Sequence, residues 1–190
     1  KVLMQAPKNG FFYVIDRTNG ELLSAEKYVQ ATWASHIDLE TGRPVKTDLA
    51  DYDEAEKLIF PGALGGHNWM PMSYNPKTGL VYIPAQELYM PMKKDDDYEY
   101  DAKGWNTAGD LTVMAPPKNL LQLMLLARSI RGRLSAWDPV EQKEVWKQYL
   151  TLPWNGGILS TDGNLVFQGT SDGELVAYDA KSGEKKWSED

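Results

Sequence analysis

The stretch ILSTDGNLVFQGTSDGELVAYDAKSGEKKW, residues 158–187, decides the expected fold. It reads as four short extended segments separated by turn residues, with Asp-Gly pairs at 162–163 and 172–173. Asp-Gly between extended runs is a strong hairpin signal, because glycine accepts the left-handed backbone that a tight turn requires. Four short strands in one continuous unit indicate a blade of a β-propeller.

The last turn of this unit recurs along the chain. An extended segment followed by Asp or Asn, three residues and Gly occurs as FFYVIDRTNG (11–20), HIDLETG (36–42), MSYNPKTG (72–79) and ELVAYDAKSG (174–183). RLSAWDPVEQ (133–142) is a weaker copy, with Gln in place of Gly. The Asp or Asn side chain caps backbone N–H groups and Gly takes the left-handed position, so each copy predicts a turn.

Two of these turns are followed by a tryptophan at the same spacing. Trp146 follows Asp138 and Trp187 follows Asp179, eight residues later in each case, and the two aspartates are 41 residues apart. A repeat of about 40–50 residues with four strands is typical of propeller blades. About four whole or partial blades fit in the chain. Ser24 or a neighbour stands where the first unit would have its tryptophan.

Two stretches break this rhythm and predict insertions, at about residues 43–60 and 90–130, in what is otherwise expected to be part of a single domain, residues 1–190. The second contains KNLLQLMLLARSIRG, which predicts a helix near 117–130. Its leucines are spread around the helix, so it should pack against another part of the protein. The Asp95–Asp97 run is interpreted as a solvated loop, with cation binding as the less favoured alternative.

Composition limits the function classes. The 190 residues carry a formal net charge of −7, which argues against a nucleic-acid partner, since phosphates require a basic surface. No apolar run is long enough for a membrane span. Without cysteine the chain holds no disulfide and no thiolate metal site, and two isolated histidines, His36 and His67, do not make a metal site.

The two ends of the chain favour an internal piece of a longer protein. The sequence begins without Met, in a strand-like pattern, and stops at the end of a repeat-like unit. An open set of blades would leave strand edges exposed. The remainder of the same propeller is therefore the expected partner.

The candidate site begins with PGALGGHNWMPM, residues 61–72, in which two glycines stand before Asn68 and Trp69. LPWNGGIL, residues 152–159, repeats this chemistry around Trp154. Glycine lets the backbone approach a ligand closely, Asn offers hydrogen bonds and Trp offers a flat surface. Two such elements predict one shared binding surface.

The segments taken together resemble the pyrroloquinoline-quinone (PQQ)-dependent alcohol dehydrogenases, and most closely the quinohaemoprotein members. The resemblance is carried by KVLMQAPKNGFFYVIDRTNG (1–20), GGHNWMPMSYNPKTGLVYIPAQE (65–87), SAWDPVEQKEVW (135–146), PWNGGILSTDGNLVFQGTSDG (153–173) and LVAYDAKSGEKKW (175–187). It implies an all-β fold, a partial β-propeller of about four blades out of eight, with one helical insert near 117–130. It also implies that the tryptophan units are the family's tryptophan-docking motifs.

The resemblance assigns cofactor-binding roles to four residues. Lys8, in APKNG, would hydrogen-bond the quinone oxygens of PQQ, where an ammonium suits the negative charge that develops on reduction. Asn68 and Trp69 would line the pocket, and Trp154 would add a further contact. From the residues alone, a surface turn lysine is the favoured interpretation of Lys8, and Asn68 and Trp69 are equally a turn-capping side chain and a core side chain. For Trp154 a core position is the less favoured alternative. Asn155 is a weaker candidate.

The remaining aromatic and imidazole side chains are assigned to structure. His67 adjoins the candidate site and is given a structural role rather than that of a base. Trp33, Trp105 and Trp137 are expected to pack in the interior. A substrate-pocket wall is the alternative for Trp33 and Trp105.

The function implied is that of part of a periplasmic PQQ-dependent alcohol dehydrogenase that oxidises primary alcohols to aldehydes, with this chain supplying one wall of the PQQ pocket. The implied cofactors are PQQ, calcium and, in the parent protein, haem c. The implied partners are a small primary alcohol and a cytochrome electron acceptor. The catalytic Asp and the calcium ligands are expected outside this chain, so no catalytic residue and no metal ligand is assigned here. The alternative is a non-catalytic quinoprotein-like propeller that acts as a protein-interaction scaffold.

Overall fold

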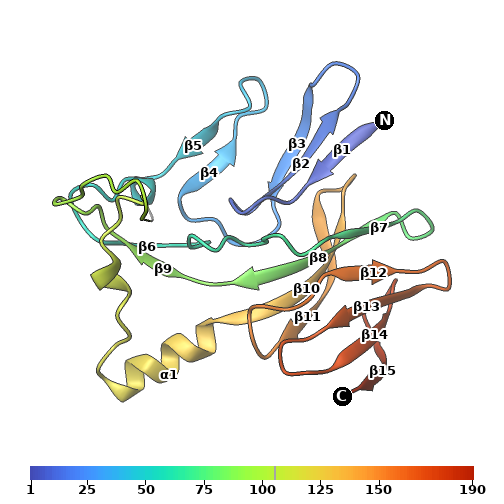
Figure 1. Cartoon of the computed structure of the whole chain (residues 1–190). Helices are drawn as coiled ribbons and strands as arrows, with labels where there is room; N and C mark the ends of the chain where they lie inside the picture. Colours follow the sequence, from blue (N-terminus) through green and yellow to red (C-terminus); the bar gives the residue numbers. More distant parts are fainter. Residues whose placement is uncertain (105) are drawn as a thin grey trace.

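Three antiparallel sheets lie one beside the next in the computed structural model, which describes residues 1–104 and 106–190 (Figure 1). Trp105, for which packing or a pocket wall was predicted, lies outside the described residues. The first blade is the sheet of β1 (Val2–Gln5), β2 (Phe11–Asp16) and β3 (Leu22–Lys27). The second blade has the order β7 (Ser73–Asn75), β8 (Leu80–Glu87), β10 (Arg131–Asp138) and β11 (Lys143–Leu150). The third blade has the order β12 (Ile158–Ser160), β13 (Leu165–Gly169), β14 (Leu175–Asp179) and β15 (Lys185–Glu189).

The connections between these strands carry the other elements. A hairpin of β4 (Ala34–Ile37) and β5 (Pro44–Lys46) is followed by a 3₁₀ turn, η1 (Asp48–Ala50). A second small sheet pairs β6 (Lys57–Ile59) with β9 (Met90–Met92). The long connection from β9 to β10 contains the 3₁₀ turn η2 (Leu111–Met114) and the helix α1 (Leu120–Ser129).

The expected partial β-propeller is confirmed, but the described residues form three blades rather than about four. The copy HIDLETG (36–42) forms the turn that its pattern predicts. It lies in the β4–β5 hairpin, which pairs with none of the three blade sheets in the part of the chain that the structure describes. The pattern sets a tight turn, and it does not fix which larger sheet the turn joins.

The first blade has three strands because its β1 corresponds to the second strand of a full blade. The turn Asp16–Gly20 joins β2 to β3, as Asp179–Gly183 joins β14 to β15. In both turns the Gly N–H donates to the Asp carbonyl, at 2.8 and 2.9 Å. The Asp179 side chain also accepts from two backbone N–H groups at 2.9 Å, and these bonds lower its pKa.

The second blade is buried on both faces, since it lies between the other two. Its strands β8 and β10 are almost continuously buried. One apolar cluster joins it to the first blade and includes Phe12, Ile83 and Trp137, so the packing role predicted for Trp137 is confirmed. A second cluster joins it to the third blade and includes Tyr82 and Val166.

The seam between the second and third blades shows how a blade tryptophan works. Trp146 donates from its indole N–H to the Ala180 carbonyl at 3.1 Å. A Cβ placed on Gly183 would lie 2.5 Å from the Trp146 ring, so the glycine is required for this contact as well as for its left-handed backbone, at φ +73°. Trp187 holds the same register position in the third blade and is exposed.

At the seam between the first and second blades, the small side chain lies on the first blade and the larger one on the second, which is the reverse of the Trp146–Gly183 pair. Ser24 occupies the register position of Trp146, beside the same bulge, and Gln142 occupies that of Gly183. Gln142 takes the left-handed backbone, at φ +52°, and its side-chain oxygen accepts from the Glu26 N–H at 3.3 Å. A small residue on one blade is thus matched by a larger one on the next.

This exchange predicts coupling between the two positions. Ser24→Trp alone should collide with Gln142, and Gln142→Gly alone should lose the bond to Glu26. The double variant recreates the pair found at the other seam. Its free energy of unfolding should therefore be about 1–2 kcal/mol higher than the value expected from adding the effects of the two single changes. Urea unfolding of the four proteins measures this, and additive changes would contradict it.

The predicted helical insert is confirmed as α1, capped by Asn119, whose side-chain oxygen accepts from the Leu121 and Gln122 N–H groups at 2.9 and 3.2 Å. The expectation that it packs against another part of the protein is not met within the described residues. Its apolar side chains are largely exposed, namely Leu120, Leu121, Leu123, Met124 and Leu125. No helix in the described ranges is long and apolar enough to cross a membrane.

Candidate cofactor-binding surface

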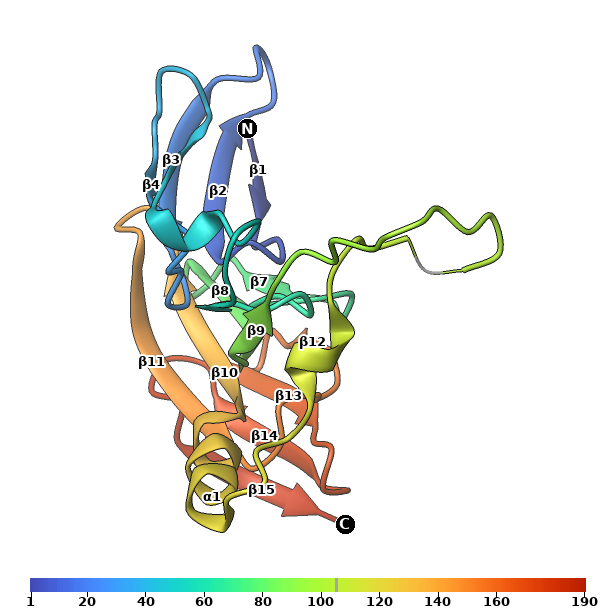
Figure 2. The same cartoon turned by 90° about the vertical axis from the view of Figure 1, so that its left-hand side faces the viewer.

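The predicted site residues all lie at one end of the blades. β1, β3, β8, β11 and β13 stop at this end, as their register shows. Lys8 lies in the turn from β1 to β2, Asn68 and Trp69 lie before β7, and Trp154 lies before β12. The connections from β3 to β7 and from β8 to β10 leave the blades from the same end, and Figure 2 shows residues 93–104 projecting away from the sheets.

Lys8 packs against the glycine pair of the loop that leads into β7. The Gly66 N–H donates to the Lys8 carbonyl at 3.0 Å. Gly65 has φ +83°, and a Cβ there would lie 2.6 Å from the Cα of Lys8. The Lys8 side chain itself is exposed, and no ion pair or hydrogen bond of its ammonium occurs within residues 1–104 and 106–190. The loop therefore fixes the backbone of Lys8 and leaves its charge uncommitted.

The two predicted tryptophans come together from neighbouring blades. The Trp69 and Trp154 ring centroids are 6.0 Å apart, with the rings inclined at 69°. Trp69 is 78% exposed and Trp154 is 38% exposed, so neither is the core residue that the alternative interpretation required. Edge-to-face packing stabilises such a pair, and the exposed faces offer an aromatic surface at the blade ends.

The two asparagines of this surface are bonded to backbone groups, Asn68 within its own loop and Asn155 both within its loop and to the β13–β14 turn. The Asn68 amide donates to the Leu64 carbonyl at 2.8 Å, and its oxygen accepts from the Trp69 N–H at 2.9 Å. Asn155 is buried, donates to the Leu152 carbonyl at 2.7 Å and accepts from the Ser171 N–H at 3.1 Å. Both asparagines therefore order the loops that present the tryptophans.

His67 lies beneath the loop rather than on the surface. Its Nδ1 is 2.6 Å from the Ala6 carbonyl and its Nε2 is 2.6 Å from the Met70 carbonyl. Both ring nitrogens face backbone oxygens, so neither is directed toward a ligand. This geometry agrees with a structural role that ties the first blade to the second.

Tyr28 supports Lys8 from below and was not identified from the sequence. Its hydroxyl donates to the Pro7 carbonyl at 2.8 Å, next to Lys8, and a Cβ on Gly66 would lie 3.0 Å from the same hydroxyl. Burial raises the pKa of Tyr28 well above its usual value, so the hydroxyl remains a donor. On the other side of the turn, the Trp33 indole donates to the Asn9 carbonyl at 2.9 Å.

Trp33 has features of both roles considered for it. It packs edge-on against Phe11, with centroids 6.0 Å apart. It also lines a cavity of about 320 Å³ whose other walls include Tyr52, Pro61 and Met92.

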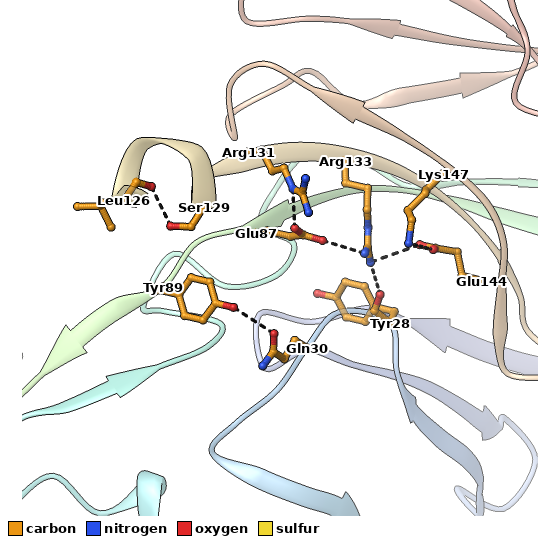
Figure 3. Close-up of polar contacts among 10 residues, drawn as sticks. All are labelled: Tyr28, Gln30, Glu87, Tyr89, Leu126, Ser129, Arg131, Arg133, Glu144 and Lys147. Atoms are coloured by element: carbon orange, nitrogen blue, oxygen red, sulfur yellow. Dashed lines mark hydrogen bonds and ion pairs between the residues drawn. The ribbon is translucent and has the colours of Figure 1, made fainter. Parts of the chain in front are cut away.

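A network of charged side chains joins the first two blades behind this surface (Figure 3). Arg133 contacts Glu87 at 3.0 Å and Glu144 at 3.4 Å, and it also donates to the Tyr28 carbonyl. Arg131 pairs with the other oxygen of Glu87 at 2.8 Å, and this bond raises the pKa of Arg131. Nearby, the Tyr89 hydroxyl donates to the Gln30 side chain at 3.1 Å. Partners so distant in sequence leave no local signal, which is why sequence reasoning missed them.

The arrangement combines an uncommitted cation with an exposed aromatic pair. An ammonium attracts an anionic ligand, and aromatic faces bind flat ring systems. No group of three or more His, Asp or Glu side chains in the described residues is placed to hold a metal ion.

Comparison with known proteins identifies relatives along the whole chain. Quinohemoprotein alcohol dehydrogenase ADH IIB of Pseudomonas putida is 49% identical over 187 residues, which cover 98% of this chain and 26% of that protein. The PQQ_2 family model, described as outer membrane protein assembly factor BamB, matches residues 113–190. The chain spans about a quarter of the length of the curated relatives it matches.

Solved structures agree with the sequence comparison. The quinohemoprotein alcohol dehydrogenase ADHIIG of Pseudomonas putida HK5 superposes with a TM-score of 0.91 at 43% identity, over 100% of this chain and 28% of that one. The quinohemoprotein alcohol dehydrogenase of Comamonas testosteroni gives 0.86 at 44% identity, with the same coverage. Over nearly its whole length, this chain is thus similar to quinohemoprotein alcohol dehydrogenases, and it spans about a quarter of the length of such a protein.

Proposed function

We propose that this chain is part of a PQQ-dependent alcohol dehydrogenase that oxidises primary alcohols to aldehydes, and that it supplies one wall of the PQQ pocket. The observation that carries the proposal is that Lys8, Trp69 and Trp154 lie at the same end of adjacent blades, with the two tryptophans packed against each other. The similar proteins are named as quinohemoprotein alcohol dehydrogenases.

The residues present fit the proposed cofactor. PQQ is a flat, anionic ortho-quinone, so its pocket needs an aromatic wall and a cation. The exposed Trp69–Trp154 pair supplies the first, and the exposed side chain of Lys8 supplies the second. Bound PQQ would supply the two-electron acceptor for alcohol oxidation.

Each residue has a limited task in this proposal. Lys8 would donate from its ammonium to a quinone oxygen and would stabilise the negative charge that develops on reduction. Trp69 and Trp154 would pack against the flat ring system and exclude water. Asn68 lines the pocket beside Trp69, and Gly65 allows the loop to lie directly against Lys8.

The other parts of the reaction are proposed to lie outside this chain. They are the carboxylate that accepts the hydroxyl proton, the calcium ligands and a haem c. The enzyme would be periplasmic, would take a small primary alcohol and would pass electrons to a cytochrome. Residues 1–190 would form part of a single propeller domain with insertions at about 43–60 and 90–130, completed by the remainder of the same propeller.

A non-catalytic scaffold is the second candidate, and the match to the PQQ_2 model, described as outer membrane protein assembly factor BamB, favours it for the C-terminal part of the chain. That match covers residues 113–190 and so does not include Lys8, Asn68 or Trp69. A scaffold has no need for an exposed lysine and an exposed tryptophan pair at the same end of its blades. These residues support the enzyme as the first candidate.

Replacing Lys8 with alanine in the complete enzyme that contains this chain tests the proposal. Loss of one charge-assisted hydrogen bond should weaken PQQ binding by about 10–100-fold and lower turnover. Titration with PQQ and steady-state kinetics measure the two effects. Lys77→Ala is the control, because Lys77 is also an exposed turn lysine but lies in the β7–β8 turn, at the opposite end of the blade. Unchanged PQQ affinity in Lys8→Ala would contradict the proposal.

A further inference from the structure

The second strand of each four-stranded blade carries a buried glutamine that bonds the loop leading into its own blade. Gln86, in β8, is 0% exposed, and Gln168, in β13, is 1% exposed. The Gln168 amide donates to one carbonyl, that of Gly156, at 3.0 Å. Gln86 makes more bonds of this kind, and they fall on the loop that contacts Lys8.

Gln86 binds three successive carbonyl groups. Its side-chain amide donates to the carbonyls of Leu64 and Gly65, both at 3.0 Å, and its backbone N–H donates to the Gly66 carbonyl at 2.8 Å. These bonds also settle which end of the amide is which, since only the nitrogen donates to carbonyl oxygens. One residue therefore fixes three residues of the loop.

The fixed backbone is the part that touches Lys8 and Asn68. The Gly66 N–H donates to the Lys8 carbonyl, and Gly65 leaves no space for a side chain against the Cα of Lys8. The Leu64 carbonyl, held by Gln86, also accepts from the Asn68 amide at 2.8 Å. A change at Gln86 is thus transmitted directly to two residues of the candidate site.

The hydrogen bonding of Gln86 does not give the fold its greatest stability, because one polar atom of the side chain has no partner among the described residues. Its side-chain oxygen is buried and, like that of Gln168, has no hydrogen-bond partner in the part of the chain that the structure describes. An unpaired buried acceptor costs stability, and such groups in folded proteins call for an explanation in function or strain. Retaining the amide at this position is explained if the donor bonds to the loop are needed.

We infer that Gln86 is a positioning residue for the cofactor site, which sets the Leu64–Gly66 backbone and thereby the place of the Lys8 ammonium. The inference rests on the proposed function of Lys8. Gln86 touches neither cofactor nor substrate in this assignment. Its effect on PQQ should therefore pass through Lys8.

A double-variant cycle in the complete enzyme tests this route. Gln86→Met keeps the length of the side chain and removes its donors, and it should weaken PQQ binding by about tenfold when Lys8 is present. In the Lys8→Ala background the same change should weaken binding by less than about twofold, because the group that it positions is gone. The alcohol KM should stay near its original value while kcat falls.

Two controls separate positioning from general loss of stability. Gln168→Met removes the corresponding donor in the third blade, and it should show no coupling with Lys8→Ala. Hydrogen exchange of the Gly66 amide, measured on the 190-residue chain without cofactor, should become faster in Gln86→Met and stay unchanged in Gln168→Met. If Gln86→Met does not fold, Gln86→Asn, which keeps the amide on a shorter side chain, takes its place.

The outcomes distinguish this inference from the proposed function. If Lys8→Ala leaves PQQ affinity unchanged, the proposed function of the surface is overturned. If Lys8→Ala weakens binding but Gln86→Met has no effect, or has the same effect in both Lys8 backgrounds, only the positioning role is overturned. Unchanged exchange of the Gly66 amide would also overturn it.

Discussion

Arg133→Met should lower the free energy of unfolding by about 3 kcal/mol. The Arg133 side chain is 8% exposed and lies between two carboxylates, those of Glu87 and Glu144. It also donates to the Tyr28 carbonyl of the neighbouring blade. Removing it leaves two partly buried carboxylates with fewer partners and removes a bond across the blade seam. Urea unfolding of the two proteins measures the difference.

Arg131→Met is the matched control. Arg131 pairs with the same glutamate, Glu87, at 2.8 Å and packs over the Tyr149 ring at 3.6 Å from its centroid. Its side chain is 41% exposed, so water screens the pair and its loss should cost less than about 1 kcal/mol. Added salt should reduce the Arg131 effect and leave the Arg133 effect nearly unchanged. Equal losses of unfolding free energy in the two variants would contradict the larger contribution expected of the buried Arg133.

The turns and strands of the blades could be predicted because their signals are local. The residues from Asp179 to Gly183 contain both the capping carboxylate and the left-handed glycine, and the turn forms as expected. Trp146 and Ser24 were placed correctly for the same reason, since a fixed spacing from the turn determines their register. The helix α1 was predicted from its run of leucines, and its end is capped by Asn119.

The blade count could not be predicted from the same turns. HIDLETG and MSYNPKTG have the same pattern as the turn between β14 and β15. The first forms the turn of the β4–β5 hairpin, and the second joins β7 to β8. A turn motif depends on four or five residues. Membership of a blade depends on pairing with strands far along the chain, for which the motif carries no information.

The residues of the site also fall into two groups, those that stand in a local sequence motif and those that do not. Lys8, Trp69 and Trp154 stand in short motifs, and the structure brings Lys8 against the Gly65–Gly66 loop and the two tryptophans against each other. Gln86 and Tyr28 have no such motif. Each is an ordinary strand or loop residue whose partners, the carbonyls next to the site, are identified only when the chain is folded.

Gly65→Ala should disrupt the same site through sterics. The alanine Cβ would lie 2.6 Å from the Cα, Cβ and Cγ of Lys8, and the residue would have to keep φ +83°. The backbone conformation alone costs about 1–2 kcal/mol. The clash is with a backbone atom, so the loop and the Lys8 turn must move apart. Moving the Lys8 turn away from the loop should displace the Lys8 ammonium and weaken PQQ binding in the complete enzyme by about a hundredfold.

Gly20→Ala separates the two causes, because it imposes the same backbone cost without the clash. Gly20 has φ +80°, and a Cβ there would meet no atom within 4 Å. Both variants should therefore lose a similar backbone contribution to thermal stability, with a further loss at Gly65 from the clash. Only Gly65→Ala should lose PQQ affinity, since Gly20 lies in the β2–β3 turn at the other end of the first blade. A normal PQQ affinity in Gly65→Ala would mean that close packing of the loop against Lys8 is not needed to hold the ammonium in place.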